Sequence, residues 1–201
     1  MSILTPLFRI QDATFKSNSP TIATESKALI QHVRRVPAQR WEFTLKSVPL
    51  YPHIGRKVWA FIIALNGRKK TFDVVIPGYS QPAGVASGSP SVRTAAEAGV
   101  TSVALEGFSG PVIGQLVEGD YVRFSNHSKV YMDTEAVNSN VSGQLTLSIY
   151  PQLTRPVSIG TGLIVRDVPF TVRQIRDMQE FKVDGRNGRI TVFELDCIEA
   201  L

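Results

Sequence analysis

The sequence predicts a mainly β protein, a β-sandwich with one α-helix that is interrupted by a small inserted β-barrel of the OB type. Three observations predict this fold class. Most segments alternate apolar and polar side chains with a period of two, which is the pattern of half-buried strands. Only residues 52–66 show the periodicity of an amphipathic helix. The stretch 83–154 differs in the sign of its charge from the segment before it and contains several short strands separated by turns.

Two strands flank the predicted helix. The segments 40–46 and 71–77 each place three apolar side chains on one face, with mostly polar residues between them. Such alternation indicates strands that turn one face to a core and the other to solvent. The side chains expected to face the core are Trp41, Phe43, Leu45, Phe72, Val74 and Ile76.

The helix is predicted over residues 52–66. Pro52 suits the first turn of a helix, and Asn66-Gly67 supplies a stop. Trp59 widens the apolar face, so we expect the helix to cover a sheet. The residues that define this face recur at spacings of three or four: Ile54, Val58, Phe61, Ile62 and Leu65.

The inserted stretch begins with a connector, because residues 81–94 are rich in Gly, Ser, Pro and Ala. Turns are expected at residues 119–120 and 140–143. Four or five short strands in a segment of this size suit a closed or nearly closed barrel. The expected strands are 101–105, 121–125, 129–133 and 144–150.

The last part of the chain is predicted to return to the first sheet. Residues 168–173 alternate, but Pro169 restricts them to an edge strand or a strand start. Residues 181–183 and 189–198 are expected to form a hairpin around the turn 184–188. A hairpin alone would be marginally stable, so its strands should pair with others.

Two domains follow from this reading. Residues 1–82 and 155–201 form the β-sandwich domain, split in sequence, and residues 83–154 form the inserted barrel. Residues 1–70 carry twelve basic and three acidic side chains, a net charge of +9, whereas residues 83–154 have a net charge of −3. A basic chain suggests nucleic-acid binding. The basic residues are scattered among strands, however, and a dipolar protomer that stacks on other proteins needs the same asymmetry.

The sequence contains no convincing catalytic constellation. The run Gly107–Pro111 resembles a nucleophile elbow, but Pro111 stands where the second Gly is required. The three histidines, His32, His53 and His127, lie in different segments without a second ligand at metal spacing. No Gly-rich loop matches a phosphate cradle. We therefore expect no enzyme, no cofactor and no metal. The absence of a long apolar run also predicts no membrane partner.

Polar and aromatic side chains of the barrel leave other roles open. The carboxylates Asp120, Asp133 and Glu135 are expected on solvated strand faces. The aromatic rings could stack on bases or sugars, but the negative charge of the barrel argues against a nucleic-acid groove. Core or interface packing is favoured for them. The candidate carbohydrate or partner contacts are Tyr121, Tyr131 and Tyr150.

Four segments, taken in order, resemble one protein family. They are Trp41–Thr44 with the helix that follows, Phe72–Tyr79, Gly119–Tyr131 and Leu147–Leu153. Their order and spacing are similar to those of siphophage distal tail proteins that carry one OB-like insertion. No single motif among them is diagnostic.

The resemblance implies a structural virion protein of the phage tail tip, made in the host cytoplasm. It implies a homo-hexameric ring that joins the tail tube protein to the baseplate hub or tail tip proteins. The barrel would point outward and bind other tip proteins or host surface saccharide, and family members have no catalytic residues. Two alternatives are a carbohydrate-binding module for host attachment and a nucleic-acid-binding OB protein. A lone Cys197 excludes an intrachain disulfide.

Overall fold

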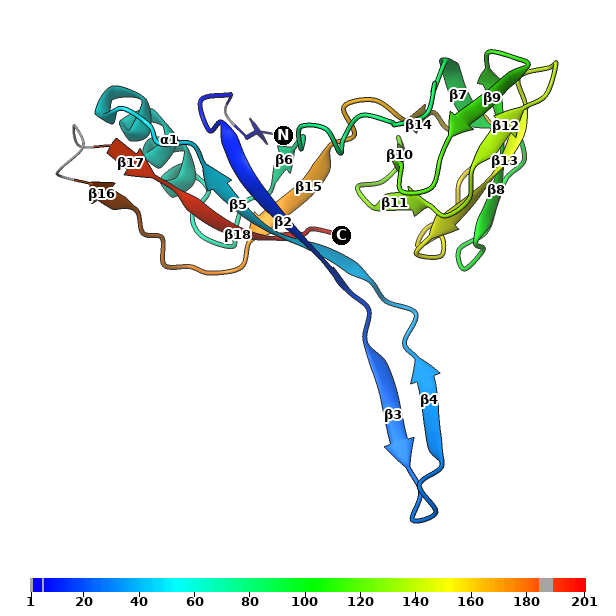
Figure 1. Ribbon diagram of the computed structural model, residues 1–201, viewed down its shortest axis with the longest axis horizontal. Coiled ribbons are helices and arrows are strands. Elements are labelled where there is room, and N and C mark those ends of the chain that lie inside the picture. Colours follow the sequence, from blue (N-terminus) through cyan, green and yellow to red (C-terminus); the bar gives the residue numbers. More distant parts are fainter. Residues whose placement is uncertain (1, 5, 185–189) are drawn as a thin grey trace.

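The structure is a computed structural model and describes residues 2–4, 6–184 and 190–201. Within these ranges the chain has one α-helix, two six-stranded sheets and three two-stranded sheets. The two large sheets carry separate hydrophobic cores and lie side by side (Figure 1). The predicted fold class, mainly β with one helix and a barrel-like insertion, is confirmed.

The first sheet joins both ends of the chain. Its strands, in spatial order, are β1 (Ser2–Ile3), β6 (Phe72–Val74), β15 (Phe170–Gln174), β18 (Glu194–Glu199), β5 (Arg40–Ser47) and β2 (Ile10–Asn18). The β1–β6 pair is parallel and the other pairs are antiparallel. Because β15 lies between β6 and β18, the polypeptide that connects β6 to β15 is an insertion in this sheet.

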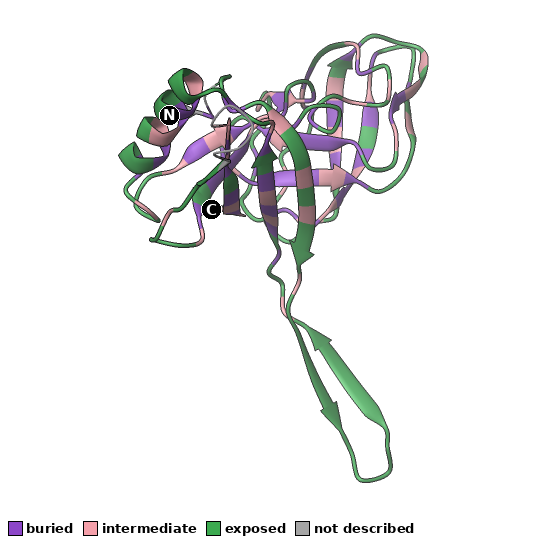
Figure 2. Ribbon diagram, turned by 60° about the vertical axis from the view of Figure 1, so that its left-hand side comes forward, coloured by how far each residue is buried: buried purple, intermediate pink, exposed green. Residues whose placement is uncertain are grey.

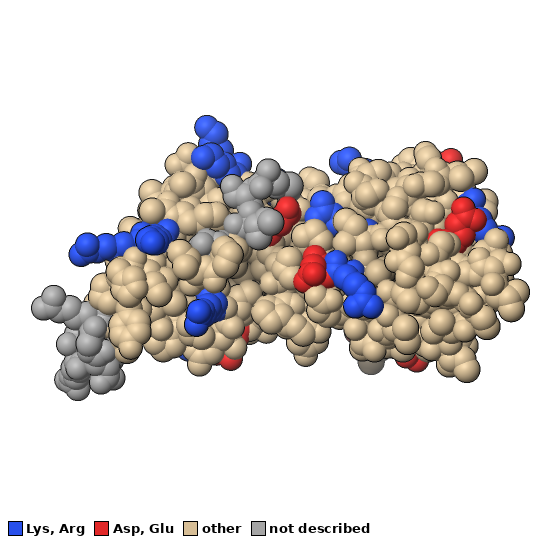
Figure 3. Space-filling model, turned by 90° about the horizontal axis from the view of Figure 1, so that it is seen from above, with Lys and Arg blue, Asp and Glu red and all other residues tan. Residues whose placement is uncertain are grey.

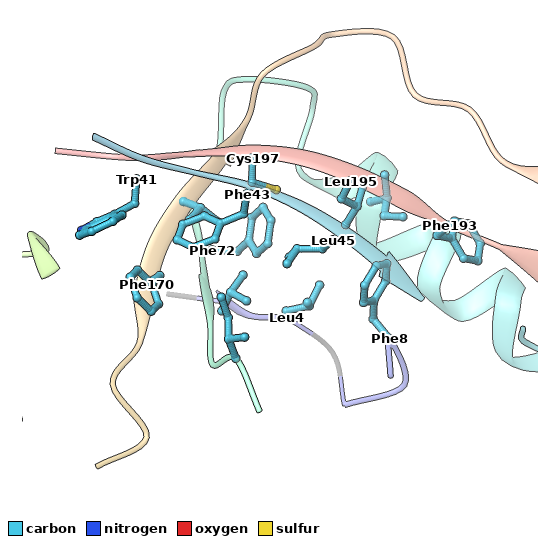
Figure 4. Close-up of a cluster of buried hydrophobic side chains, with 14 of the residues drawn as sticks. Leu4, Phe8, Trp41, Phe43, Leu45, Phe72, Phe170, Phe193, Leu195 and Cys197 are labelled. Atoms are coloured by element: carbon cyan, nitrogen blue, oxygen red, sulfur yellow. The ribbon is translucent and has the colours of Figure 1, made fainter. Parts of the chain in front are cut away.

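The core of the first sheet follows the predicted alternation. Trp41, Phe43 and Leu45 of β5 are buried, and Phe43 packs edge-on against Phe170 with ring centroids 4.9 Å apart. Leu195 and Cys197 of β18 lie on the same face (Figure 4). One end of this face is covered by helix α1, and the other end by the second domain.

Helix α1 (Pro52–Ala64) begins as predicted and ends two residues before the predicted end at residue 66. Pro52 occupies its first turn, and Leu65 is the C-cap. Asn66 and Gly67 both have positive φ, 53° and 59°, which turns the chain out of the helix. Gly67 is also required sterically, because a Cβ there would lie 2.8 Å from the Asp177 carboxylate.

The predicted C-terminal hairpin is only partly found. Strand β16 (Lys182–Asp184) pairs with β17 (Ile190–Val192) in a separate two-stranded sheet, while β18 pairs with β5. Between β17 and β18 the backbone N–H of Phe193 donates to the Ser47 hydroxyl, which breaks the expected long strand in two. Of the predicted turn 184–188, residues 185–188 lie outside the described residues.

The second sheet forms the inserted barrel. Its strands, in order, are β14 (Leu163–Ile164), β10 (Tyr121–Phe124), β11 (Val130–Asp133), β13 (Leu145–Tyr150), β8 (Ser102–Phe108) and β7 (Gly88–Val92). The two outer strands meet, because the Val92 N–H donates to the Thr161 carbonyl at 2.9 Å and Ser91 bridges Gly162. The sheet is therefore nearly closed. Strands β9 (Val112–Leu116) and β12 (Val137–Ser139) pair with each other beside it.

The barrel continues beyond the predicted boundary at residue 154. Strand β14 pairs with β10, and Val157, Leu163 and Val165 are buried in the core of the second sheet. The prediction of a domain change at 155 is therefore wrong by about ten residues. The connection 155–165 lacks a regular alternation, so periodicity could not assign it to the barrel.

Candidate functional site: a projecting hairpin arm

The most exposed element of the protein is a two-stranded hairpin that projects from the first sheet. Strand β3 (Thr21–Glu25) pairs with β4 (Gln31–Arg35) in a separate antiparallel ribbon beyond β2 and β5. All residues from 20 to 35 are exposed, and the ribbon contacts neither core (Figure 2). We call residues 20–35 the arm.

The arm carries large apolar side chains that are exposed to solvent. Ile22 is 56% exposed, Val33 59%, Ile30 58% and Leu29 80%. Ile22 and Val33 lie on opposite faces of the ribbon, because Ile22 pairs with Arg34 and Val33 pairs with Ala23. An isolated two-stranded hairpin is marginally stable in water, and exposed apolar side chains on a projecting element mark an interaction site.

The tip of the arm holds a leucine in a strained conformation. The turn is closed by hydrogen bonds from the Ser26 N–H to the Ile30 carbonyl, 3.0 Å, and from the Leu29 N–H to the Ser26 carbonyl, 2.9 Å. Leu29 has φ 59°, the left-handed region, which costs an ordinary L-residue about 1 kcal/mol. Glycine would fit this turn without strain, so Leu29 displays its side chain at an energetic cost.

The root of the arm is held by the barrel. The Tyr150 hydroxyl, at the end of β13, hydrogen-bonds with the Ser19 hydroxyl, and the Arg35 guanidinium lies 5.4 Å from the centre of the Tyr150 ring. Such a cation–π contact contributes roughly 0.5–1 kcal/mol at an exposed site. Tyr150, a predicted partner contact, thus contacts the arm of its own chain.

The other two candidate tyrosines are buried. Tyr121 is 9% exposed and lies among the rings of Phe15, Trp41 and Phe170. Tyr131 is fully buried in the barrel core. Burial raises the pKa of both hydroxyls. The three tyrosines therefore do not form a shared exposed platform for carbohydrate.

Tyr121 and Tyr131 are buried because other parts of the protein cover both faces of β10 and β11. Tyr121 and Val130 pack into the core of the first sheet, whereas their neighbours Val122 and Tyr131 pack into the barrel core. Both faces of these two strands are buried, so alternation along the sequence could not tell an exposed aromatic face from a second interface.

A buried ion pair joins the two domains. The Lys129 ammonium donates to the Glu199 carboxylate, and also to the side-chain and backbone oxygens of Gln39 at 2.6 and 3.2 Å. Glu199 accepts the backbone N–H groups of Val130, 2.9 Å, and Trp41, 3.2 Å. Lys129 and Glu199 are each 1% exposed. Burial lowers the pKa of Lys129, and the charge of Glu199 opposes that effect.

Further contacts fix the same junction. The indole N–H of Trp41 donates to the Val130 carbonyl at 2.9 Å. The Arg123 guanidinium of β10 donates to the Pro169 carbonyl, 2.9 Å, and to the Thr171 hydroxyl, 3.2 Å. Since the barrel holds both the first sheet and the arm root, the direction of the arm is fixed relative to both domains.

Two carboxylates expected in solvent are buried instead. Asp120 accepts the backbone N–H groups of Ala83, Gly84 and Val117 at 2.7–3.2 Å. Asp133 is fully buried, and its Oδ2 has no hydrogen-bond partner among the described residues. Burial raises the pKa of Asp133 to about 7, with smaller contributions from the charges of Asp120 and Glu118. The prediction of solvated strand faces is wrong for both residues: Asp120 lies in the turn before β10 and is buried against the backbone of residues 83–84 and 117, and Asp133 is buried at the end of β11.

His127 also has a structural role. Its Nδ1 lies 2.7 Å from the Asn126 carbonyl oxygen, which can only accept, so Nδ1 carries the proton. Its Nε2 then accepts from the Tyr131 hydroxyl at 2.8 Å. Burial lowers the pKa of His127 to about 4, and the nearby charges of Arg155, Arg123 and Lys129 add to that effect. The histidine is therefore neutral at physiological pH.

No protein-family model matches the chain, and no curated protein matches it in sequence. Across the described ranges, no group of three His, Cys, Asp or Glu side chains is placed to hold a metal ion. No helix in that part of the chain is long and apolar enough to cross a membrane. Basic side chains are scattered over the face seen in Figure 3, with acidic ones between them.

The arm is the feature that sequence reasoning missed. The runs 21–25 and 31–35 alternate weakly, and the Ser26-Lys27 pair between them is polar and turn-like. These signals could have indicated a hairpin. They could not have indicated that it projects, because a strand exposed on both faces has no apolar face to reveal its surroundings.

Proposed function

We propose that the protein is a structural virion component, a distal tail protein whose copies form a hexameric ring between the phage tail tube and the tail tip or baseplate. The order of segments that resembles this family supports the proposal. The observation that carries it is the exposed arm, because an apolar projecting hairpin with a fixed root is suited to hold another protein.

A ring also suits the way the arm is attached. In a closed ring each copy uses one surface to contact one neighbour and a different surface to contact the other. An arm that projects to one side, with its direction set by contacts such as Arg35 on Tyr150, gives each copy such a directional surface. The barrel would then be displayed by the ring to other tip proteins.

The buried charged and titratable side chains of the domain junction and the barrel make contacts within the protein. Lys129 and Glu199 lock the domain junction, and His127 supports the Tyr131 hydroxyl. For carbohydrate binding, Tyr121 and Tyr131 would have to be exposed, and both are buried. The geometry therefore favours the structural proposal over a carbohydrate-binding module.

The test is the state of assembly of the purified full chain. We expect light scattering after size-exclusion chromatography to give a mass six times that of the monomer, and negative-stain images to show sixfold rings. Addition of the tail tube and hub proteins from the same phage should cap the two faces of the ring. A protein that stays monomeric at every concentration and salt level, alone and with those partners, would overturn the proposal.

A further inference from the structure

A groove lies at the end of the first sheet away from the arm. Its volume is about 690 Å³, and it lies between the loop 176–182 and the strands β5, β17 and β18. Among the described residues, three basic and three acidic side chains line it, and their formal charges cancel. Its apolar lining is formed by Pro49, Met178, Phe181, Ile190 and Val192.

The groove is anchored to the core and open to solvent. The ring of Phe181 packs in tilted geometry against Trp59 and Phe193, with ring centroids 4.7 and 5.5 Å apart, which ties the groove to helix α1 and the core. Phe181 is nevertheless 40% exposed and Met178 78% exposed. The groove thus offers a supported apolar surface with nothing from its own described chain upon it.

The arm tip has matching chemistry but cannot reach the groove of its own chain. Leu29 and Ile30 form an apolar tip whose only charged neighbour in the turn is Lys27. The arm extends from the Arg40 end of β5, whereas the groove is lined by Lys46 near the other end. Those ends are separated by roughly 25 Å of strand, and the arm points away from the first sheet (Figure 1). A contact between tip and groove must therefore join two copies.

We propose that the arm tip of one copy inserts Leu29 and Ile30 into this groove on a second copy. The proposal rests on the ring proposed above and names the contact that builds it. Each copy donates one tip and receives another, which is the head-to-tail contact that closes into a ring. Insertion would remove Leu29, the most exposed of the large apolar side chains of the arm, and its neighbour Ile30 from water.

The area buried by each contact between arm tip and groove determines how stable a pair of copies is compared with a closed ring. A standard interface uses about 20–30 residues and ~800 Å² on each side. All sixteen residues of the arm are exposed, and burial of the whole arm would supply on the order of 500 Å² by the same ratio, so a contact made by the tip supplies less than this. That is too small for a stable pair, but in a closed ring every copy makes two such contacts. Assembly should therefore pass from monomer to ring with few intermediates and, because the contact is apolar, should persist in high salt.

Cross-linking tests the contact directly. One preparation carries Leu29→Cys and a second, distinguishable by a mass tag, carries Met178→Cys. Mixed and oxidised, they should give a covalent dimer that contains one chain of each kind. The native Cys197 is buried with its pKa raised to about 12, so it contributes little background. The matched control pairs Leu29→Cys with Val141→Cys, since Val141 is equally exposed (82%) but lies on the barrel.

Charge variants give an independent readout. Leu29→Asp and Met178→Asp, each at an exposed position, should leave thermal unfolding unchanged and abolish the ring, whereas Val141→Asp should retain it. A wild-type ring that survives both substitutions, without the Leu29–Met178 cross-link, would overturn this contact and leave the proposed function standing. If the wild type forms no ring and tip binding occurs only with a different protein, the second-copy proposal and the ring both fail.

Discussion

The carboxyl group of Asp133 is buried inside the barrel, and its effect on the stability of the folded protein depends on pH. Its pKa is about 7 in the folded protein, against 3.8 for an unperturbed aspartate. The folded state therefore favours the protonated form. The stability contributed by this group is fully present below pH 4 and is lost as the pH rises to 7. At about 1.4 kcal/mol per pKa unit, the loss is on the order of 4 kcal/mol.

The substitution Asp133→Asn should remove this dependence. The amide keeps the oxygen that accepts the Glu135 N–H and cannot ionise. We expect the variant to match the wild type near pH 4 and to exceed it by roughly 3–4 kcal/mol above pH 7. The measurement is the free energy of unfolding in urea across that range. Glu135→Gln, at an exposed carboxyl two residues away, is the control and should show no such gain.

His127 affects the pH dependence of stability in the opposite direction over the same pH range. Its pKa is about 4 in the folded protein, below the ordinary 6.5, so the stability it contributes is present above pH 6.5 and is lost as the pH falls towards 4. The wild-type pH profile combines both effects. The difference between the wild type and Asp133→Asn at each pH isolates the aspartate, and a difference that stays constant from pH 4 to 8 would contradict a buried ionisable carboxyl.

The arm is held at its root by a side chain of the other domain. Ribbon β3–β4 has no core of its own, and Tyr150 holds its root through Ser19 and Arg35. Local elements with few buried contacts open at low free energy. The barrel therefore restricts the motion of an element that belongs to the other domain.

Replacement of Tyr150 should loosen the arm without unfolding the protein. Tyr150→Ala removes the hydroxyl and the ring, and we expect several-fold faster trypsin cleavage after Lys27, Arg34 and Arg35. The cost in global stability should stay near 1–2 kcal/mol. Tyr150→Phe keeps the ring under Arg35 and should fall between Ala and the wild type. Cleavage rates are followed by mass spectrometry, and equal rates in all three proteins would show that the root contact does not restrain the arm.

At the scale of the whole molecule, the buried ion pair joins the two domains across their junction. Lys129 comes from the barrel and Glu199 from the last strand of the first sheet, and Trp41 reaches across the same junction. A desolvated pair with every partner in place resists separation, because removal of one member leaves the other charged and buried.

Lys129→Met should cost about 3–5 kcal/mol and divide the unfolding transition. We expect wild-type unfolding, followed by calorimetry, to give one cooperative transition and the variant to give two. The double variant Lys129→Met with Glu199→Gln should regain most of the loss, since no uncompensated charge remains. Arg68→Met serves as the control, because the Arg68–Asp177 pair is exposed and such pairs contribute little. If Lys129→Met unfolded in one transition like that of the wild type, the result would contradict the expectation that this ion pair couples the two domains.

The sequence by itself determined the fold class and the position along the chain of the helix and of several strands. The alternation in β5 and β6, the periodicity of α1 and its Asn66-Gly67 stop, and the strands around Tyr121, Tyr131 and Ile149 all follow from local patterns. These patterns are informative because a side chain that faces a core must be apolar wherever the strand is placed.

Only the tertiary structure decided what covers the second face of each strand. It buried Tyr121 against the first sheet, Asp133 inside the barrel and Glu199 against Lys129, and it left the arm uncovered. It also assigned Leu163 and Val165 to the barrel. Local periodicity records that a face is apolar but not which distant segment packs on it. The weak alternation of the arm strands can indicate a hairpin but not that the hairpin projects from the protein.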